Sequence, residues 1–229
     1  MNLFGLISTV FYFKTAQKTK NIPVLNKFPP ILLAGIALIL TLELFNIDFD
    51  TYNESATFLT YLLIPSTIAL GYPVYKNIEL LKKNKRIIYT AFILATILAI
   101  ISTYIFAKIC HCNINIIESM LPKSVTAPIA VEISKNLGGI PELTACVVVL
   151  TGVFGAMFGH KILKLIKVKS DIAIGLSIGA ASHIIGTSKC VETNREKQIV
   201  MASVALVIVG ILSAIVAPLF LHLIRYFNH

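Results

Sequence analysis

The sequence predicts an all-α membrane protein that crosses the bilayer several times, built as an inverted-repeat bundle with discontinuous or re-entrant helices. Three observations support this fold class. Hydrophobic residues make up 56% of the 229 residues and charged residues only 14%, outside the usual range of soluble domains. Long uncharged windows recur along the chain, and mostly lysine-rich loops separate them. Prolines and polar residues interrupt some windows, which is typical of broken helices in transporters.

Five windows of 17 or more residues contain no formally charged side chain, and about 20 such residues span the hydrocarbon core. These windows are 57–75, 87–107, 143–159, 172–188 and 198–221. A sixth window, 31–47, is interrupted only by Glu43. The apolar stretch Asn2–Phe13 has about 12 residues, so the sequence leaves open whether it spans the bilayer.

The charges of the loops predict the direction of each span. Basic residues dominate 14–27, 76–86 and 161–169, which places these loops in the cytoplasm. The loop 46–56 carries only acidic charges and is expected outside. Because the same rule explains the net charge of +9, no nucleic-acid partner is predicted.

The segment from Cys110 to Pro141 is expected to begin and end outside, because the window before it runs outward and the window after it runs inward. A single crossing is therefore excluded. The segment can lie along the interface, cross an even number of times or re-enter. We favour a re-entrant hairpin bent around Pro122 and Pro128, with Gly138-Gly139 at its exit.

The spacing of the windows predicts an internal symmetry. Windows that begin at 31, 57 and 87 recur at 143, 172 and 198, offset by roughly 112, 115 and 111 residues. The first set runs out–in–out and the second in–out–in, which predicts inverted repeats 1–108 and 112–229 within one membrane domain, 1–229. The alternative is that any protein with six spans shows such spacings by chance.

The hairpin places charge and hydroxyl groups at membrane depth. Ionisable groups there are costly and often mark a substrate or ion path. We predict that Lys123, Ser124 and Thr126 bind an anion, helped by the amides of a helix N-terminus. The alternative for Lys123 is that it reaches the outer interface and only anchors the hairpin.

A second polar run, Gly179–Lys189, lies within the window 172–188. Its small residues have a simple explanation, because they let membrane helices approach closely. Its histidine is interpreted as functional, either by bonding substrate or by taking up a coupled proton, since its unperturbed pKa lies near physiological pH. The residues predicted to bind substrate here are Ser182, His183, Gly186 and Thr187.

Enzymatic and metal sites find little support in the sequence. The motifs G-x-S-x-G, H-E-x-x-H and Walker A are absent, so no enzymatic activity is expected. Cys110-His111-Cys112 resembles a metal-binding pattern but lacks a second cluster, so no metal and no other cofactor is predicted. A disulfide between Cys110 and Cys112 is an alternative for this loop.

Four short runs carry a resemblance to a known family: Leu121–Ala130, Gly138–Thr144, Thr151-Gly152 and Ala181–Thr187. Together with Phe4-Gly5 and the segment from Pro65 to Tyr75, they resemble the LrgB/CidB family in order and spacing, over essentially the whole chain. Lys189 and Cys190 depart from the family pattern, where an Arg and a residue like Ala are expected.

The resemblance implies a multi-pass protein of the bacterial cell membrane. Bacterial members are described as antiholin-like proteins that modulate murein hydrolase activity and autolysis, usually beside a small holin-like partner. A related plant plastid protein transports glycolate and glycerate, and some bacterial pairs are implicated in pyruvate uptake. The family thus also implies a carrier of small organic acids.

We therefore predict a secondary transporter of small monocarboxylates of the glycolate, glycerate, lactate and pyruvate class, coupled to protons or to sodium. The alternative is an antiholin-like regulator of murein hydrolase activity and autolysis that acts with a small holin-like membrane protein, and a third is a channel. The expected partners are a small organic anion, the lipid bilayer, a holin-like membrane protein and further copies of the chain in a homo-oligomer.

Overall fold

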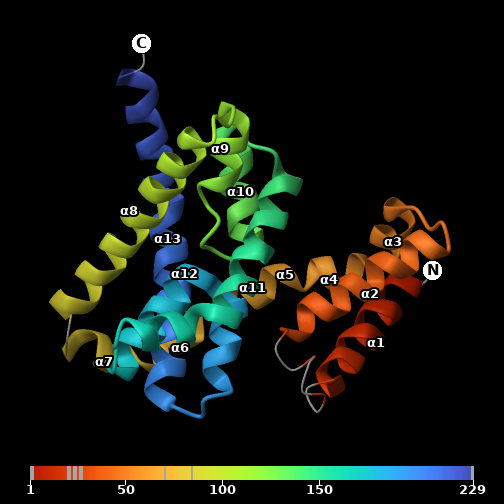
Figure 1. The fold of residues 1–229 in the computed structure, drawn as a ribbon, viewed down its shortest axis with the longest axis horizontal. Helices are drawn as coiled ribbons and strands as arrows, with labels where there is room; N and C mark the ends of the chain where they lie inside the picture. Colours follow the sequence, from red (N-terminus) through yellow and green to blue (C-terminus); the bar gives the residue numbers. More distant parts are fainter. Residues whose placement is uncertain are drawn as a thin grey trace. The chain divides into compact units, whose positions relative to one another are not determined.

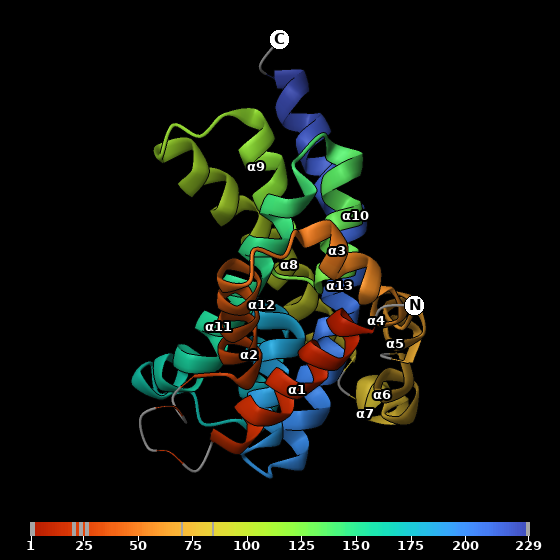
Figure 2. The ribbon, with the colours of Figure 1, turned by 90° about the vertical axis from the view of Figure 1, so that its right-hand side faces the viewer.

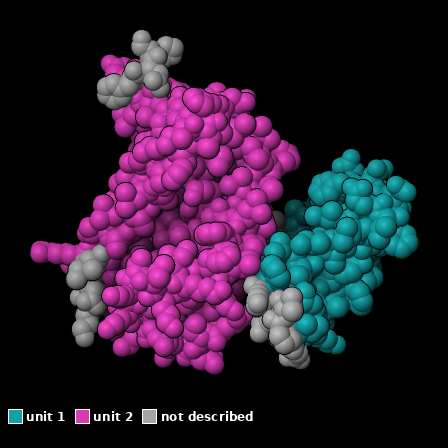
Figure 3. All heavy atoms as spheres, viewed as in Figure 1, with its two compact units in different colours: residues 1–69 teal, residues 70–229 magenta. Residues whose placement is uncertain are grey.

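The computed structural model describes residues 3–19, 22, 25, 28–69, 71–83 and 85–227, and its helices are labelled in Figure 1. The regular elements among these residues are helices, and none of the residues forms a β-strand. This confirms the predicted all-α fold class. The chain divides into two compact units, Met1–Ala69 and Leu70–His229 (Figure 3). The inverted repeats stay a prediction.

The first unit contains helices α1 to α5. Helix α1 packs against α2 and α3, and Thr9 and Tyr12 of α1 place their hydroxyl groups 2.7 Å from the Tyr52 hydroxyl and 2.5 Å from the Thr41 hydroxyl. The bounds are α1 Phe4–Lys18, α2 Pro30–Leu44, α3 Phe49–Ser55, α4 Thr57–Tyr61 and α5 Leu63–Ala69. At 1.5 Å per residue, the 15 residues of α1 and of α2 cover about 22 Å each, less than a hydrocarbon core of about 30 Å.

One predicted span is divided into short helices, at a place where prolines interrupt the apolar window. The window 57–75 is divided among α4, α5 and α6 (Gly71–Lys76). Pro65 and Pro73 are each the third residue of a short helix, and proline is tolerated in the first turn because that turn's N–H groups have no partner within the helix. The prolines therefore begin new helices here instead of lying within one long helix.

The second unit contains helices α6 to α13. Besides α6, their bounds are α7 Ile78–Lys83, α8 Lys85–Ile109, α9 Ile114–Met120, α10 Ala127–Leu137, α11 Pro141–Leu165, α12 Asp171–Val191 and α13 Glu196–Phe227. Three of these helices contain segments long and apolar enough to cross a membrane: Ile88–Ile109, Pro141–Leu165 and Glu196–Tyr226. They confirm the windows 87–107, 143–159 and 198–221, and with them a multi-pass membrane protein.

The segment between α8 and α11 forms a helical hairpin of α9, the loop Leu121–Thr126 and α10. With 7 and 11 residues, α9 and α10 cover about 10 and about 16 Å, so neither crosses a bilayer alone. Helix α10 ends at Gly138, whose φ of 97° is the left-handed conformation that glycine adopts without a Cβ penalty. The predicted bend and exit of the hairpin lie at these residues.

Helix α13 runs along the second unit, beside α12 at one end and beside α10 at the other (Figures 1 and 2). At the α12 end the two backbones lie close together, because a Cβ on Gly175 or Gly179 would overlap the backbone of Gln198 or Ala202. At the other end, Ala217 and Leu221 share a buried apolar cluster with residues of α8, the hairpin and α11. This cluster is the core on which the hairpin rests.

Candidate functional site

The loop Leu121–Thr126 contains the first group of predicted site residues. Ser124 and Thr126 are buried, with 6% and 5% of their surface exposed. Thr126 occupies the N-cap position of α10, yet its hydroxyl does not cap the helix. Its Oγ1 atom is buried and has no hydrogen-bond partner among the residues that the structure describes. A buried hydroxyl without a partner is costly, so this atom at a helix N-terminus is a candidate contact for a ligand.

Lys123 is half-buried in the same loop. Its ammonium group has no ion-pair partner among the residues that the structure describes, although its backbone N–H donates to the Met120 carbonyl. The loop therefore combines an uncompensated positive charge with two buried hydroxyl groups.

The second group of predicted residues surrounds an interruption in α12. His183 has a φ of 42° and a ψ of −139°, which divides the helix into residues 171–182 and 184–191. A non-glycine residue in this region costs of the order of 1–3 kcal/mol and persists only where surrounding packing imposes it. The broken helix that the polar run 179–189 predicted is present, with its break at the histidine.

The hydrogen bond of His183 determines what its ring can offer. The Nε2 atom lies 2.9 Å from the Val148 carbonyl oxygen of α11, and the residue is only 1% exposed. A carbonyl oxygen only accepts, so Nε2 carries the proton in this contact. In the neutral ring Nδ1 is then a bare acceptor, and it is buried without a partner in the described part of the chain.

Glycines of α11 make room for this break. A Cβ on Gly152 would lie 2.6 Å from Cε1 of His183, and a Cβ on Gly155 would overlap Oγ of Ser182. Only the absence of both side chains lets α11 approach α12 here. The sequence run Thr151-Gly152 is thus explained by space for the imidazole ring.

The other residues predicted at this break have contacts within the protein. The Thr187 hydroxyl donates to the His183 carbonyl oxygen at 2.8 Å, and a Cβ on Gly186 would collide with the side chain of Ser182. Ser182 is 4% exposed and lies in the contact with α11. Of the seven predicted residues, Thr126 and His183 are therefore the two that hold a buried polar atom without a partner.

Helix α11 connects the two groups, because it packs against both α10, which follows the loop, and α12, which contains the break. Among the described residues no hydrogen bond joins the loop 121–126 to the break. Val125 of the loop and Val148, which bonds His183, belong to the same buried apolar cluster. The structure thus connects the two interruptions through α11 and this cluster.

Sequence reasoning missed a network of hydroxyl groups that joins the hairpin to α11. The Ser119 hydroxyl accepts from the Ile140 N–H at 2.7 Å, and the Thr144 hydroxyl donates to Ser134 at 2.7 Å. Ser119, Ser134 and Thr144 are completely buried. The run Gly138–Thr144 had pointed to this place, but not to the serines that it contacts.

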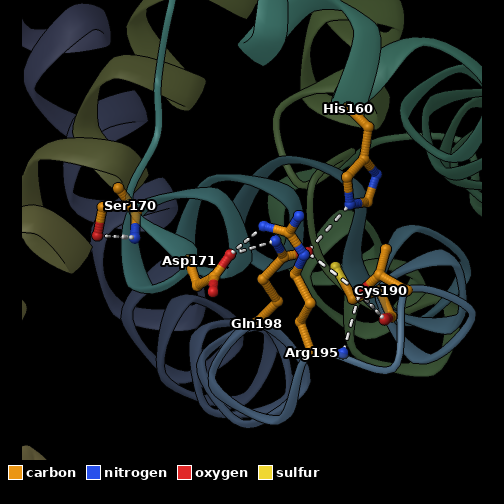
Figure 4. A network of polar contacts seen from close by, with 8 residues as sticks. His160, Ser170, Asp171, Cys190, Arg195 and Gln198 are labelled. Atoms are coloured by element: carbon orange, nitrogen blue, oxygen red, sulfur yellow. Dashed lines mark hydrogen bonds and ion pairs between the residues drawn. The ribbon is translucent and has the colours of Figure 1, made fainter.

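A further network lies where α11, α12 and α13 meet at their loop ends (Figure 4). Asp171 accepts from Gln198 at 2.7 Å and from Arg195 at 2.9 Å, and the Gln198 Oε1 lies 3.3 Å from Nε2 of His160. The hydrogen bond from Gln198, with that from Arg195, lowers the pKa of the Asp171 carboxyl below its ordinary value of 3.8. Arg195 lies in the exposed loop before α13 and connects this loop to the start of α12.

A family model described as LrgB-like family matches residues 9–223 of the chain. The chain belongs to the LrgB-like family. This confirms the resemblance carried by the four sequence runs. In the structure these LrgB-like runs lie at the loop 121–126, at the hairpin exit, at the glycine that faces His183 and at the break itself.

Relatives cover most of the chain. An antiholin-like protein LrgB of Bacillus mycoides is 34% identical over 85% of this chain and 84% of its own length. A holin-like protein CidB of Staphylococcus epidermidis is 31% identical over 94% of this chain and 93% of its own. An uncharacterized protein of Haemophilus influenzae is 37% identical over 87% and 86%. No solved structure matches the chain.

Two of these names are of the antiholin and holin type. Together with the three spanning helices, they identify this LrgB-like chain as a multi-pass protein of a bacterial membrane. Among the described residues no group of three or more His, Cys, Asp or Glu side chains is arranged to hold a metal ion. All four cysteines, Cys110 and Cys112 included, are free thiols.

Proposed function

We propose that this LrgB-like protein carries small monocarboxylates across the membrane, with a site formed by the two interruptions of its second unit. The observation that supports this proposal is the pair of orphaned atoms, Thr126 Oγ1 and His183 Nδ1. Each lies at a broken helix, as substrate sites of many secondary transporters do. Two independent breaks that both bury a polar atom without a partner are unexpected in a protein that binds nothing.

The chemistry of the two atoms suits a hydroxylated or keto monocarboxylate. The Thr126 hydroxyl and the α10 N-terminus offer donors to a carboxylate, and Lys123 adds positive charge. The neutral His183 ring offers an acceptor at Nδ1, which fits a substrate hydroxyl such as that of glycolate, glycerate or lactate. Pyruvate has no such hydroxyl and would need the protonated ring instead.

The protonation state of His183 links this proposal to the coupling ion. A proton taken up at Nδ1 would turn the acceptor into a donor for a carboxylate or keto oxygen, which makes the proton one of two candidate coupling ions. Sodium is the other. Uptake driven by a pH gradient without sodium separates the two.

The names of the relatives favour a second function. They are antiholin-like and holin-like, and neither name mentions transport. We therefore also propose, as the alternative, a regulator of murein hydrolase activity and autolysis that acts with a small holin-like membrane partner and uses no substrate. Lipid-facing surfaces, such as the exposed residues Ile211, Ile215 and Leu219 of α13, would then carry the function.

The experiment that tests the carrier is uptake of labelled glycolate and pyruvate by proteoliposomes containing the purified full chain. The carrier predicts saturable uptake and counterflow above the level of empty liposomes. Uptake equal to that of empty liposomes for both acids contradicts it. Uptake that is linear in concentration and lacks counterflow supports a channel.

A lysis assay in the bacterial host separates the carrier from the regulator. If the carrier underlies the phenotype, Thr126→Val and His183→Ala abolish it, because both remove an orphaned polar atom. The regulator predicts that these changes leave lysis intact, while Ile211→Ala and Ile215→Ala, on an exposed face of α13, reduce it.

A further inference from the structure

One charged contact ties the hairpin to the distal end of α13. Nη2 of Arg225 lies 2.5 Å from Oε1 of Glu118 in α9. The same guanidinium nitrogen lies 3.3 Å from the carbonyl oxygen of Leu137, near the end of α10. Arg225 therefore bonds both helices of the hairpin at once.

The two partners differ strongly in exposure. The Glu118 side chain is 2% exposed, whereas that of Arg225 is 56% exposed. No other hydrogen bond or ion pair reaches the Glu118 carboxylate among the residues that the structure describes. A buried carboxylate that loses its partner is strongly unfavourable, so the position of α9 depends on Arg225 staying in place.

The contact also reaches the exit of the hairpin. Glu118 Oε2 would lie 3.0 Å from a Cβ on Gly138, the residue with positive φ that ends α10. Leu137 O, which accepts from Arg225, is one of the terminal carbonyls of α10 that lack a helical partner. A cation at this position also interacts favourably with the C-terminal end of the helix dipole.

We infer that the Glu118–Arg225 pair is a latch that holds the hairpin on α13 and keeps the loop 121–126 closed. The loop contains Thr126 and Lys123 of the proposed substrate site. A role of the latch in substrate access therefore rests on the proposed function. Ile117 and Leu121, which flank Glu118 in α9 and its following turn, pack in the same apolar cluster as Leu221 of α13. A movement of α13 that breaks the ion pair would thus release α9 and the loop 121–126, which contains the first group of candidate site residues.

The test measures how quickly a cysteine in the loop reacts with a water-soluble maleimide. Val125→Cys is the reporter, because Val125 is 1% exposed between Ser124 and Thr126. Full-length protein in lipid nanodiscs is labelled, and mass spectrometry resolves each cysteine. The exposed Cys110 serves as the reference, and the fully buried Cys190 reports general loosening of the fold.

Arg225→Gln in the reporter background is expected to raise labelling at position 125 by about tenfold or more, because Arg225 is the only charged partner of the Glu118 carboxylate among the described residues. Adding Glu118→Gln removes the uncompensated charge and should bring the rate back toward that of the parent. The matched control is Lys135→Gln. It breaks the exposed Glu132–Lys135 pair of the same hairpin, whose atoms are 4.0 Å apart, and should leave the rate unchanged.

An unchanged rate in Arg225→Gln overturns the latch, and so does a parallel rise at Cys190, which would indicate a loosened fold. The rate does not depend on transport. A large rise at position 125 in a protein that takes up no glycolate supports the latch and contradicts the carrier. Uptake of glycolate with an unchanged labelling rate supports the carrier and contradicts the latch.

Discussion

The two interruptions in the second unit, the loop 121–126 and the break at His183, leave the same kind of atom unsatisfied but arise differently. Pro122 lies in the loop and Pro128 in the first turn of α10, and a proline restricts both its own backbone and that of the preceding residue. The break in α12 has no proline. Its φ of 42° at His183 is held by the bond to Val148 and by the contact with the glycines of α11.

The interruption at the loop 121–126 is local, because prolines next to it in the sequence cause it. The interruption at His183 is tertiary, because contacts with another helix hold it. The local one depends on residues next to it in the sequence, so it should survive changes elsewhere. The tertiary one depends on α11, and a change on α11 should move it. Helix α13 shows the converse case. It continues through Pro218, a residue that often interrupts a helix, and it packs against neighbouring helices.

The largest expected effect comes from closing the space on α11 that the tertiary break needs. Gly155→Ala places a Cβ where the Ser182 hydroxyl lies, and we expect a loss of stability of about 3 kcal/mol from overpacking. The matched control is Gly159→Ala, whose Cβ would be 3.6 Å from Cγ1 of Ile178, an ordinary contact. Thermal unfolding of purified protein measures both. Equal midpoints for the two variants would contradict the role of α11.

The next effect concerns the orphaned hydroxyl of the local interruption. Thr126→Val removes an atom without a partner, so we expect stability to rise by about 1 kcal/mol and glycolate affinity to fall by about tenfold. Thr144→Val is the control, because the Thr144 hydroxyl lies 2.7 Å from that of Ser134, and we expect a loss of about 1 kcal/mol. Thermal unfolding and glycolate binding are measured for both variants. A stability change of the same sign in the two would contradict the view that the Thr126 hydroxyl is unpartnered and the Thr144 hydroxyl is hydrogen-bonded.

A third prediction tests the strain at the tertiary break. Glycine adopts positive φ without penalty, so His183→Gly should be more stable than His183→Ala by about 1 kcal/mol. At Ser182, where the helix is regular, the order should reverse by about 1 kcal/mol, with alanine the more stable. Four midpoints of thermal unfolding decide the matter. The same order at both positions would show that the backbone at His183 is not strained.

The smallest effect concerns the hydrogen bonds of Asp171 at the start of α12, in the half of the helix before the break. Because hydrogen bonds lower the pKa of Asp171 in the folded protein, its contribution is fully present above the ordinary pKa of 3.8 and is lost as the pH falls through the lower folded value. Asp171→Asn should therefore lose less stability between neutral pH and about pH 3 than the parent does. Equal losses in Asp171→Asn and in the parent, measured by unfolding at the two pH values, would contradict a contribution of the Asp171 carboxylate to stability.

Much of the fold could be predicted from the sequence, because the long apolar windows and the prolines of the hairpin are local signals. The prolines of the window 57–75 likewise indicated an interruption, and the window is divided into several short helices. The sequence also indicated a polar break within 179–189. It could not place the break at His183, because the space that permits it belongs to Gly152 and Gly155 of another helix.

The candidate site shows the same limit. Polar residue types at membrane depth indicated Lys123, Ser124, Thr126 and His183 as site residues. The structure then distinguishes Thr126 and His183, because each has a buried polar atom without a hydrogen-bond partner among the described residues. The hydroxyl of Thr187 has a backbone partner, which no residue pattern reveals. Glu118 and Arg225 lie 107 residues apart, so their pairing depends on how α13 returns to the hairpin.

The central claim is that the two interruptions bind one small carboxylate between them. Its most direct test is equilibrium binding of glycolate to the purified full chain, to Thr126→Val, to His183→Ala and to the double variant. We expect measurable binding to the parent, a loss of about tenfold in each single variant, and a loss in the double variant smaller than the about hundredfold that two independent effects would give, because both residues contact the same ligand. Binding that is unchanged in either single variant would contradict the claim.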